Sequence, residues 1–389
     1  MYEGRMVFPQ ILEFLPRRTF DSCVRRYHGN RNVRSLTCRD QFLAMMFAQL
    51  TSRESLRDVE TCLAAVQPKL FHAGFRGPVR RSTLADANHK RDWRIWQDLG
   101  LALIKYARRL FADDPLPNEL KNAAYALDAT VLNLSLTLFP WAHSQRDKAA
   151  VKLHTLLDLR GNIPCFLRIS STKSRDSAML DEVPLEAGAL YVMDRDFNDY
   201  RRLYQLHQTG AFFLVRGKNN LSFRCRKSRP VNRATGIRSD QTVLFRDHRT
   251  SRKYPDHLRR ISYVNVETRR RFVFVTNHFQ LPAQDIVHLY WRRWEIELFF
   301  KWVKQHLRIK HFLGNTPNAV KTQLWIAVST YVLVVILKRE LQIERSMSEI
   351  LQILSVTIFE KTSIKTVLEQ NEFPKLESTL HKQLYLFDL

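Results

Sequence analysis

A run of charged and aromatic residues at 289–307 limits how this chain can fold. The segment LYWRRWEIELFFKWVKQHL has strong helix-forming character, and its polar side chains recur at intervals of three and four: Tyr290, Arg293, Glu297, Lys301 and Lys304. Those intervals return to one face of an α-helix. The opposite side carries Trp291, Trp294, Leu298, Phe299 and Trp302. Most of the helix circumference can therefore be buried, and a carboxylate among cations on such a helix indicates a functional site.

The charge of the chain favours a polyanionic partner. Its 389 residues include 62 Lys and Arg against 38 Asp and Glu, which gives a net charge of +24. An excess of this size is most often found in proteins that bind nucleic acid, although a very soluble basic protein is the alternative. Residues 201–280 alone hold 19 Arg and Lys against four Asp and Glu. The length allows two or three domains with a sizeable core.

The cysteines and the apolar segments favour a cytoplasmic protein. None of the five cysteines has CxxC spacing or belongs to a Cys/His cluster of the zinc-binding kind. An odd number of cysteines fits a reducing compartment. The N-terminus has no signal-peptide core. The longest apolar run, 324–337, is shorter than a membrane span and predicts a buried core helix.

The pattern of apolar residues changes along the chain. Helical spacing dominates up to about residue 118, and a short helix at 82–91 is either a DNA-recognition element or an ordinary surface helix. From AAYALDATVLNL onward the sequence predicts three antiparallel strands, then a strand, a helix and a strand, which is an α+β arrangement. The expected domains are a helical DNA-binding domain at 1–118, a catalytic core at 119–200 and 271–345, a basic β-rich insertion at 201–270, and C-terminal tail helices at 346–389.

Three acidic residues occupy places that suggest a metal site. Asp128 lies inside the apolar strand YALDATVL, Asp194 ends the strand LYVMD, and Glu297 lies on the polar stripe. An acid inside a strand is unfavourable unless it is paired or ligated. Three converging carboxylates would suit Mg²⁺, and two such ions can act on a phosphodiester. Alternatively, Asp128 lies at a strand edge, and an acid of MDRDFNDY caps the next helix.

The segment YWRRWEIELFFKWVK resembles the signature of DDE transposases of bacterial insertion sequence family four. That signature is Tyr, two residues, Arg, three residues, Glu, six residues and Lys, which places Tyr290, Arg293, Glu297 and Lys304. LDATVL and VMDRDFNDY resemble the two blocks that hold the family's aspartates, 66 residues apart, and the glutamate follows 103 residues later. The N-terminal region also resembles one subgroup, so the resemblance covers nearly the whole chain. Asp196 stands where the family usually has Gly; Asp194 is retained because it ends the strand.

The resemblance implies an RNase H-like catalytic core that is interrupted by a β-rich insertion. Asp128, Asp194 and Glu297 would hold Mg²⁺ or Mn²⁺, as two ions. DNA phosphates would be bound by the stripe and by the insertion, through Tyr290, Arg293, Lys301, Lys304, Arg224, Arg226, Lys227 and Arg229. The tryptophans of the stripe segment, Trp291, Trp294 and Trp302, are expected in the core. The aromatic residues Phe223, Phe245 and Tyr254 are the candidates to stack on a displaced base.

The function implied is that of a DNA transposase of an insertion sequence. It would bind the terminal inverted repeats, cut at the ends with metal-activated water, and transfer the freed 3′-hydroxyl to target DNA. A homodimer in a synaptic complex and a bacterial cytoplasmic protein, nucleoid-associated when bound to DNA, are further expectations. The alternatives are a metal-dependent nuclease of the same fold without strand transfer, and a catalytically inactive DNA-binding protein descended from a transposase.

Overall fold

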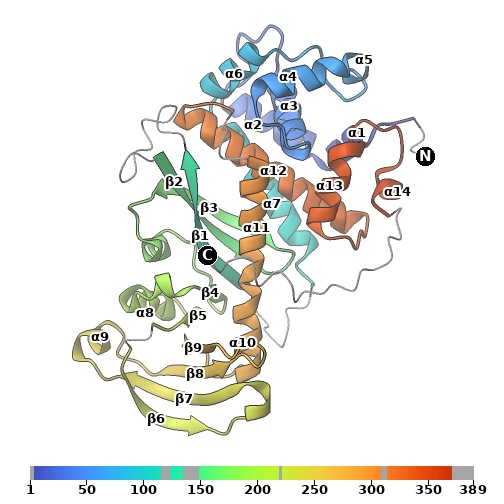
Figure 1. Ribbon diagram of the computed structural model, residues 1–389. Helices are drawn as coiled ribbons and strands as arrows, with labels where there is room; N and C mark the ends of the chain where they lie inside the picture. The colour runs from blue at the N-terminus through green and yellow to red at the C-terminus, as the bar shows by residue number, and fades with distance from the viewer. Residues whose placement is uncertain (1–3, 115–122, 135–148, 219–220, 308–312, 370–389) are drawn as a thin grey trace.

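The computed structural model describes residues 4–114, 123–134, 149–218, 221–307 and 313–369. Helices from both ends of the sequence gather at one end of the molecule, and a large sheet extends away from them (Figure 1). Helices α10 and α11 run along the sheet toward the helical end, where α12 continues into the helices (Figure 1). This is the α+β arrangement that the sequence predicts.

The first part of the chain is helical, as expected. Its helices are α1 (Val7–Ile11), α2 (Arg17–Arg26), α3 (Cys38–Leu50), α4 (Leu56–Ala65), α5 (Gln67–Leu70), α6 (Arg81–Lys90) and α7 (Arg94–Leu110). Helix α3 starts with a capping box, in which Thr37 accepts from the Asp40 N–H and Asp40 accepts from the Thr37 N–H. Nearly every residue of α3 is buried, so it forms the centre of this part.

The short helix predicted at 82–91 is α6, and part of its polar surface faces inward. Asn88 is 1% exposed and its side chain accepts a hydrogen bond of 2.7 Å from Gln41. The Arg91 guanidinium donates to Gln41 and to the Leu36 carbonyl. These two side chains hold α6 to α3 and are engaged internally, which leaves His89 and Lys90 as the exposed polar residues of its last turn.

Helix α12 (Pro317–Glu340) is the buried core helix that the apolar run predicts. Thr316 caps it, and Pro317 occupies its first turn, where a missing N–H costs nothing. It packs against α3, α6, α7 and α11. By length and composition α12 could cross a membrane, but 94% of its apolar window is buried inside the protein. Helices α13 (Met347–Thr357) and α14 (Ile364–Glu369) follow it.

The described strands form one nine-stranded sheet in the order β3-β2-β1-β4-β5-β9-β8-β7-β6. Their bounds are β1 (Ala124–Leu134), β2 (Ala149–Asp158), β3 (Ile163–Ser171), β4 (Leu190–Met193), β5 (Phe212–Arg216), β6 (Phe223–Arg229), β7 (Ile237–Phe245), β8 (Leu258–Val264) and β9 (Arg271–Thr276). Strands β1, β4 and β5 are parallel, and the other neighbours are antiparallel. The β2–β3 hairpin turns at Gly161 and Asn162, both with positive φ, where the sequence RGN predicts a turn.

Alternation along the strands puts the two strand-borne acids on one face of the sheet. Ala124 and Ala126 pack into the helical core, whereas Tyr125 and Leu127 pack on the side of α8 (Tyr200–Gln208). Asp128 continues the series of Ala124 and Ala126. In β4, Leu190 and Val192 face α10, and Asp194 follows in the same alternation. Both acids are therefore directed toward the face that α10 and α11 cover.

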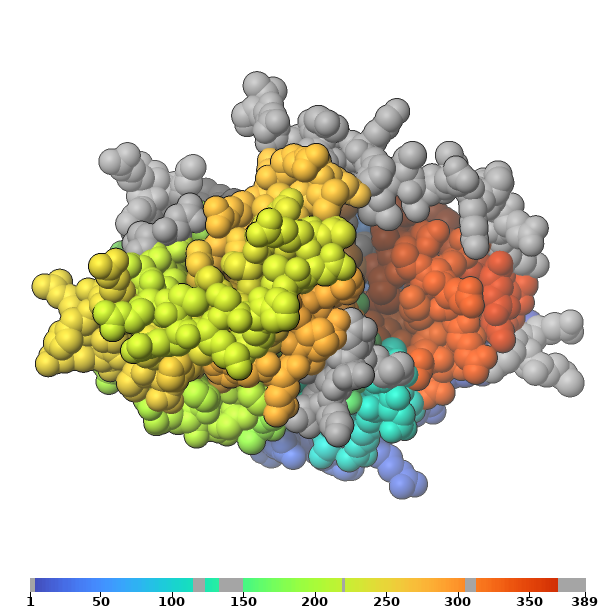
Figure 2. All heavy atoms as spheres, turned by 90° about the horizontal axis from the view of Figure 1, so that it is seen from below, coloured from blue at the N-terminus to red at the C-terminus, as the bar shows by residue number. Residues whose placement is uncertain are grey.

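The basic region extends the sheet of the core. Strand β5 pairs in parallel with β4, and β9 pairs with β5, so β6 to β9 continue the same sheet. By this pairing, α8 and β5 lie with the core although they fall within 201–270, and the β-rich part begins after β5. Strand β6 is the outer edge, and all of its residues from Arg224 to Ser228 are exposed. Figure 2 shows the face of the molecule that these outer strands form.

Acidification should destabilise the fold through His278, which lies after β9 and is 7% exposed. Its Nδ1 accepts the Leu281 N–H, and burial, aided by Arg259, lowers its pKa to about 4. The unfolded chain would bind a proton near pH 6.5, so stability should be lost as the pH falls from about 6.5 to 4. The expected loss is about 3 kcal/mol, at roughly 1.4 kcal/mol per pKa unit.

Denaturant unfolding at several pH values measures this effect. The variant His278→Gln should flatten the pH dependence between pH 7 and 5, whereas His248→Gln, at an exposed position, should leave it unchanged. An equal pH dependence in wild type and His278→Gln would show that His278 is not the responsible group.

Candidate active site

The polar stripe is carried by two helices that meet at Arg293. The sequence predicts one helix over 289–307, but the structure has α10 (Ala283–Arg292) and α11 (Trp294–Leu307), and Arg293 lies at the junction. Tyr290 therefore extends from the last turn of α10, and Glu297 from the first turn of α11. The junction lies beside β1 and β4, because α10 contacts β4 and α11 contacts β1.

The Arg293 guanidinium joins two of the three acids. Its Nη1 donates to Asp128 Oδ2, and its Nη2 donates to Glu297 Oε1 at 2.9 Å. Asp194 lies alongside, where its Oδ1 accepts from the Tyr290 hydroxyl at 3.2 Å. The structure thus brings Asp128, Asp194 and Glu297 to one place, from two strands and one helix.

The site is buried enough to shift its titrations. Burial raises the pKa of Asp128 to about 6; the nearby Asp194 and Glu297 contribute to the rise, while Arg293 and the Ala129 N–H oppose it. Burial also raises the pKa of Tyr290 to about 12, with a further contribution from Asp194. Burial alone would lower the pKa of Arg293, but the surrounding carboxylates and Tyr290 raise it overall. The centre therefore concentrates negative charge around one cation.

The neighbouring acids lie outside the cluster of Asp128, Asp194 and Glu297. Asp196 is exposed in the short 3-10 turn Arg195–Phe197. Asp199 caps α8 by accepting from backbone N–H groups at its start, as the sequence allowed for an acid of this block. Glu295 accepts from the Asn162 side chain at 2.9 Å, on the β2–β3 turn. Asp194, which ends the strand, is the acid of its block that joins Asp128.

The donor set fits a divalent cation once Arg293 moves. Among the residues that the structure describes, no three His, Cys, Asp or Glu side chains stand in metal-holding geometry, and the Arg293 guanidinium lies between Asp128 and Glu297. Carboxylate oxygens are the ligands that Mg²⁺ and Mn²⁺ prefer. The Arg293 Nε is buried without a hydrogen-bond partner among the described residues, so Arg293 does not use all of its donors here.

The outer side of α11 faces solvent beside the acids. Lys301 and Lys304 are exposed. Trp294 is 52% exposed and Leu298 is 60% exposed, whereas Trp302 is 6% exposed. The expectation of buried tryptophans is therefore correct for Trp302 and wrong for Trp294. Trp302 packs against Phe299 and Tyr331, and no pattern in the sequence signals these contacts.

The cations predicted for the insertion fall into two groups. Arg224, Arg226 and Lys227 are exposed on the edge strand β6. Arg229 instead lies 3.3 Å from Asp240, a buried acid that also pairs with Arg259. This acid could not be recognised as the partner of Arg229 without the β6–β7 register, which aligns the two residues.

The aromatic residues predicted to stack on a displaced base are largely internal. Phe245 is 7% exposed and Tyr254 is 1% exposed. Phe223 is partly buried and stacks on Phe245, with ring centroids 4.9 Å apart. Phe245 and Tyr254 are thus core residues in the structure, and Trp294 is the exposed aromatic beside the acids.

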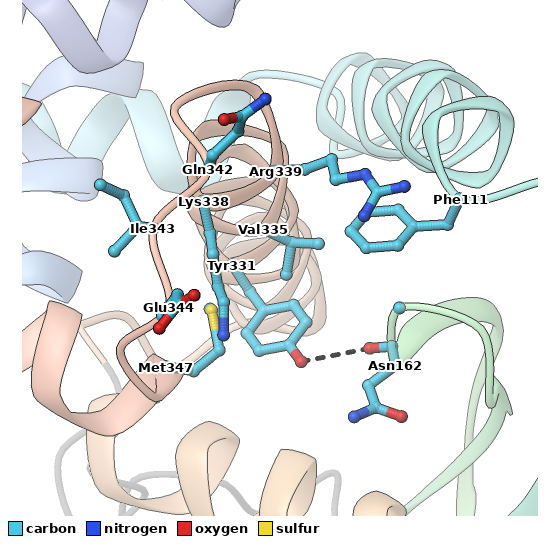
Figure 3. Close-up of a pocket in the computed structure, with 11 residues that line it drawn as sticks. Phe111, Asn162, Tyr331, Val335, Lys338, Arg339, Gln342, Ile343, Glu344 and Met347 are labelled. Atoms are coloured by element: carbon cyan, nitrogen blue, oxygen red, sulfur yellow. Dashed lines mark hydrogen bonds between the residues drawn. The ribbon is translucent and has the colours of Figure 1, made fainter. Parts of the chain in front are cut away.

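A hollow of about 710 Å³ lies apart from the acids, between the end of α7, the β2–β3 turn and the end of α12. In Figure 3, Tyr331 points toward Asn162 and donates its hydroxyl to the Asn162 carbonyl, at 3.1 Å. Arg339 lies over the Phe111 ring. Because Asn162 also binds Glu295, this wall of the hollow helps to hold the first turn of α11 in place.

Comparisons with known proteins identify the family of this chain. The family described as "Transposase DDE domain" matches residues 120–333, and a domain of unknown function matches residues 3–76. A protein of Sinorhizobium fredii that is named as a transposase is 30% identical over 73% of this chain and 79% of its own length. A Geobacillus stearothermophilus protein named as the transposase for insertion sequence element IS5377 is 28% identical over 53% of this chain and 54% of its own.

One solved structure and one further relative extend the comparison. A Synechocystis protein named as a transposase for insertion sequence element IS4SA is 23% identical over 72% of this chain and 79% of its own length. A solved structure of a piggyBac transposase in a synaptic complex with hairpin DNA aligns with 95% of this chain and 79% of its own, at a TM-score of 0.47 and 10% identity. The match over more than half of the sequence shows that the chain belongs to the DDE transposase family, among transposases of insertion sequences of an IS4-like kind.

Proposed function

We propose that this DNA transposase binds the terminal inverted repeats of its insertion sequence and cuts and transfers their strands at Asp128, Asp194 and Glu297. The observation that carries the proposal is the meeting of Asp128 and Glu297 on Arg293, with Asp194 beside them. The parallel β1, β4 and β5, with antiparallel β2 and β3 beside them, form the RNase H-like core. The extension β6 to β9 is the insertion that precedes Glu297.

The three carboxylates would hold two Mg²⁺ or Mn²⁺ ions, which activate the attacking oxygen and stabilise the leaving oxygen at a phosphodiester. Arg293 has to release Asp128 and Glu297 for this. A DNA phosphate is a suitable new partner, because a guanidinium forks onto phosphate oxygens as it does onto carboxylates. Tyr290 donates one hydrogen bond, and Lys301 and Lys304 add point charges along the same side of α11.

Trp294 and Leu298 present an exposed apolar surface on α11, the helix that also carries Glu297 and the exposed lysines. A base that leaves the duplex near the cut would find an aromatic face there, and base–aromatic stacking stabilises binding by roughly 1–3 kcal/mol. We therefore assign base stacking to Trp294 in place of the insertion aromatics. The complete reaction would use two copies of the chain on paired DNA ends, in the cytoplasm.

Strand mapping tests the function. The protein is incubated with DNA that carries the element's terminal repeats and their flanks, with Mg²⁺ or Mn²⁺, and the cut strands are sequenced. Cuts at the repeat ends followed by joining of 3′-hydroxyls to target DNA support the proposal. Cuts without joining would indicate a nuclease, and sequence-specific binding without cuts would indicate a non-catalytic DNA-binding protein.

Neutralising the exposed cations of β6 should flatten the salt dependence of DNA binding. Arg224, Arg226 and Lys227 have exposed side chains in position to release counterions from DNA, and each phosphate contact contributes about 0.9 to the slope of log affinity against log salt. Replacing all three by Ala should lower the slope by about 2–3. The variant Arg229→Ala is the control, because Arg229 pairs with Asp240 and should affect stability more than the slope. An unchanged slope in the triple variant would exclude β6 as a main phosphate-binding surface.

A further inference from the structure

A polar hollow lies just beyond the end of β4, on the face of the sheet opposite Arg293. It measures about 590 Å³ and is lined by β2, the 3-10 helix η3 (Asp176–Asp181), the turn before α8, Lys218 and Leu221 after β5, and α9 (His248–Lys253). Asp196, on its wall, is two residues after Asp194, so their Cα atoms are at most about 7 Å apart. Tyr200, also on the wall, belongs to the core on the α8 side of the sheet.

The cations of the hollow outnumber its acids by one: Lys152, Arg175, Lys218 and Lys253 stand against Asp176, Asp196 and Asp199. Asp199 pairs with Arg202, outside the lining. Arg175, Lys218 and Lys253 are exposed on its walls, and none of them has an ion-pair partner among the described residues. Lys152, by contrast, is held by Asp176 at 3.0 Å and by the Ser174 carbonyl. The lining of charged and polar side chains is suited to an anion. Cations that converge from separate elements are typical of phosphate binding.

The position of the hollow relative to the three acids determines which part of a bound DNA can contact it. A phosphodiester that is cut at Asp128, Asp194 and Glu297 has DNA strand on both sides of it. Lys301 and Lys304 lie on the α11 face of the sheet. The hollow lies beyond Asp194, on the other face of the sheet. Helix α9, which belongs to the β-rich extension, forms one of its walls. The two cationic surfaces therefore lie on opposite sides of the catalytic carboxylates.

We propose that this hollow, named here the flank hollow after Arg175, Lys218 and Lys253, binds the phosphodiester backbone of the DNA that flanks the element beyond the cut. The inference rests on the proposed function, since it takes the acids as the point of cleavage. The terminal repeat lies along α11, and the flanking strand passes the end of β4 to the other face of the sheet, where it enters the flank hollow. Asp196 repels phosphate from the wall closest to the acids and thereby weakens flank binding.

Two duplexes distinguish flank binding from end binding. One carries the terminal repeat and stops at the cut, and the other carries the same repeat extended by flanking DNA. Affinity is measured by fluorescence anisotropy over a series of salt concentrations, without divalent metal. Wild type should bind the extended duplex more tightly. In the double variant Lys218→Ala/Lys253→Ala that gain should disappear, and the salt slope for the extended duplex should fall by about 2.

The matched control removes two exposed lysines from the C-terminal helical region, Lys361→Ala/Lys365→Ala, and should leave both duplexes unaffected. Asp196→Asn should strengthen binding of the extended duplex only. This variant tests the proposal independently if the double variant folds poorly. The inference is overturned if the double variant loses affinity equally for both duplexes or for neither, or if Asp196→Asn leaves extended-duplex binding unchanged. Failure of wild type to prefer the repeat over unrelated DNA, or to cut it with metal, would instead overturn the proposed function.

Discussion

Replacing Glu297 by Gln is expected to lower DNA cleavage by several orders of magnitude while end binding persists. The change keeps the shape of the side chain and its place in the first turn of α11, but it removes a charge that the metal ions need. Metal positioning supplies most of the rate in such reactions, and every 1.4 kcal/mol of lost transition-state stabilisation is a factor of ten. Binding should be equal or tighter, because a negative charge near phosphate has gone.

Lys304→Ala provides the contrasting variant. Lys304 is exposed on α11, so its loss should weaken end binding by roughly 1–3 kcal/mol, as for a charged hydrogen bond. The variant should still cut DNA in the presence of metal when the protein concentration is high. If these residues were only part of a solvated helix face, each change would cost a few tenths of a kcal/mol in stability. Normal cutting by a folded Glu297→Gln protein would remove the catalytic assignment of this helix.

Replacing Arg293 by Gln should have opposite effects on metal binding and on cleavage. In the protein without DNA, the guanidinium occupies Asp128 and Glu297, so a divalent cation must compete with it. Hydrogen bonds to charged groups contribute about 1.5–3 kcal/mol, so their removal should tighten Mn²⁺ binding by about 10–100-fold. Cleavage should nevertheless fall, because Arg293 is the proposed phosphate ligand.

Titration calorimetry with Mn²⁺ at pH 8 measures the first effect, at a pH above the raised pKa of Asp128, which is about 6. Arg292→Gln is the matched control, since Arg292 binds the Leu159 carbonyl at 2.7 Å and is not bonded to the three acids. It should leave Mn²⁺ affinity unchanged. Equal Mn²⁺ affinities in wild type and Arg293→Gln would show that Arg293 does not compete with the metal.

Much of the site could be predicted because its acids interrupt apolar patterns. Asp128 inside one strand and Asp194 at the end of another are recognisable by alternation, and the parallel pairing of β1 and β4 aligns Leu127 with Met193, so the two acids follow side by side. Glu297 was recognisable from its spacing to Tyr290 and Arg293. The division of the helix at Arg293 was not, since its backbone remains close to helical and the residues around it favour helix.

The rest depended on tertiary contacts that local sequence does not encode. Whether Trp294 or Trp302 faces solvent depends on what packs against α11, and it is Trp302 that packs on Phe299 and Tyr331. Whether Arg229 is free for DNA is decided by the register that aligns it with Asp240. Tyr254 looked available among basic residues, yet its hydroxyl bonds to His207 at 2.8 Å inside the protein. Charge runs therefore identified a basic surface but did not separate its solvent-facing residues from its buried ones.

The most direct test of the account is the position of Mn²⁺ in crystals of the protein with terminal-repeat DNA, determined by anomalous scattering. We expect two peaks roughly 3.5–4 Å apart, bound by Asp128, Asp194 and Glu297, with the Arg293 guanidinium moved from the carboxylates to a DNA phosphate. Mn²⁺ bound only elsewhere, with Arg293 still joined to Asp128 and Glu297 in the DNA complex, would contradict it.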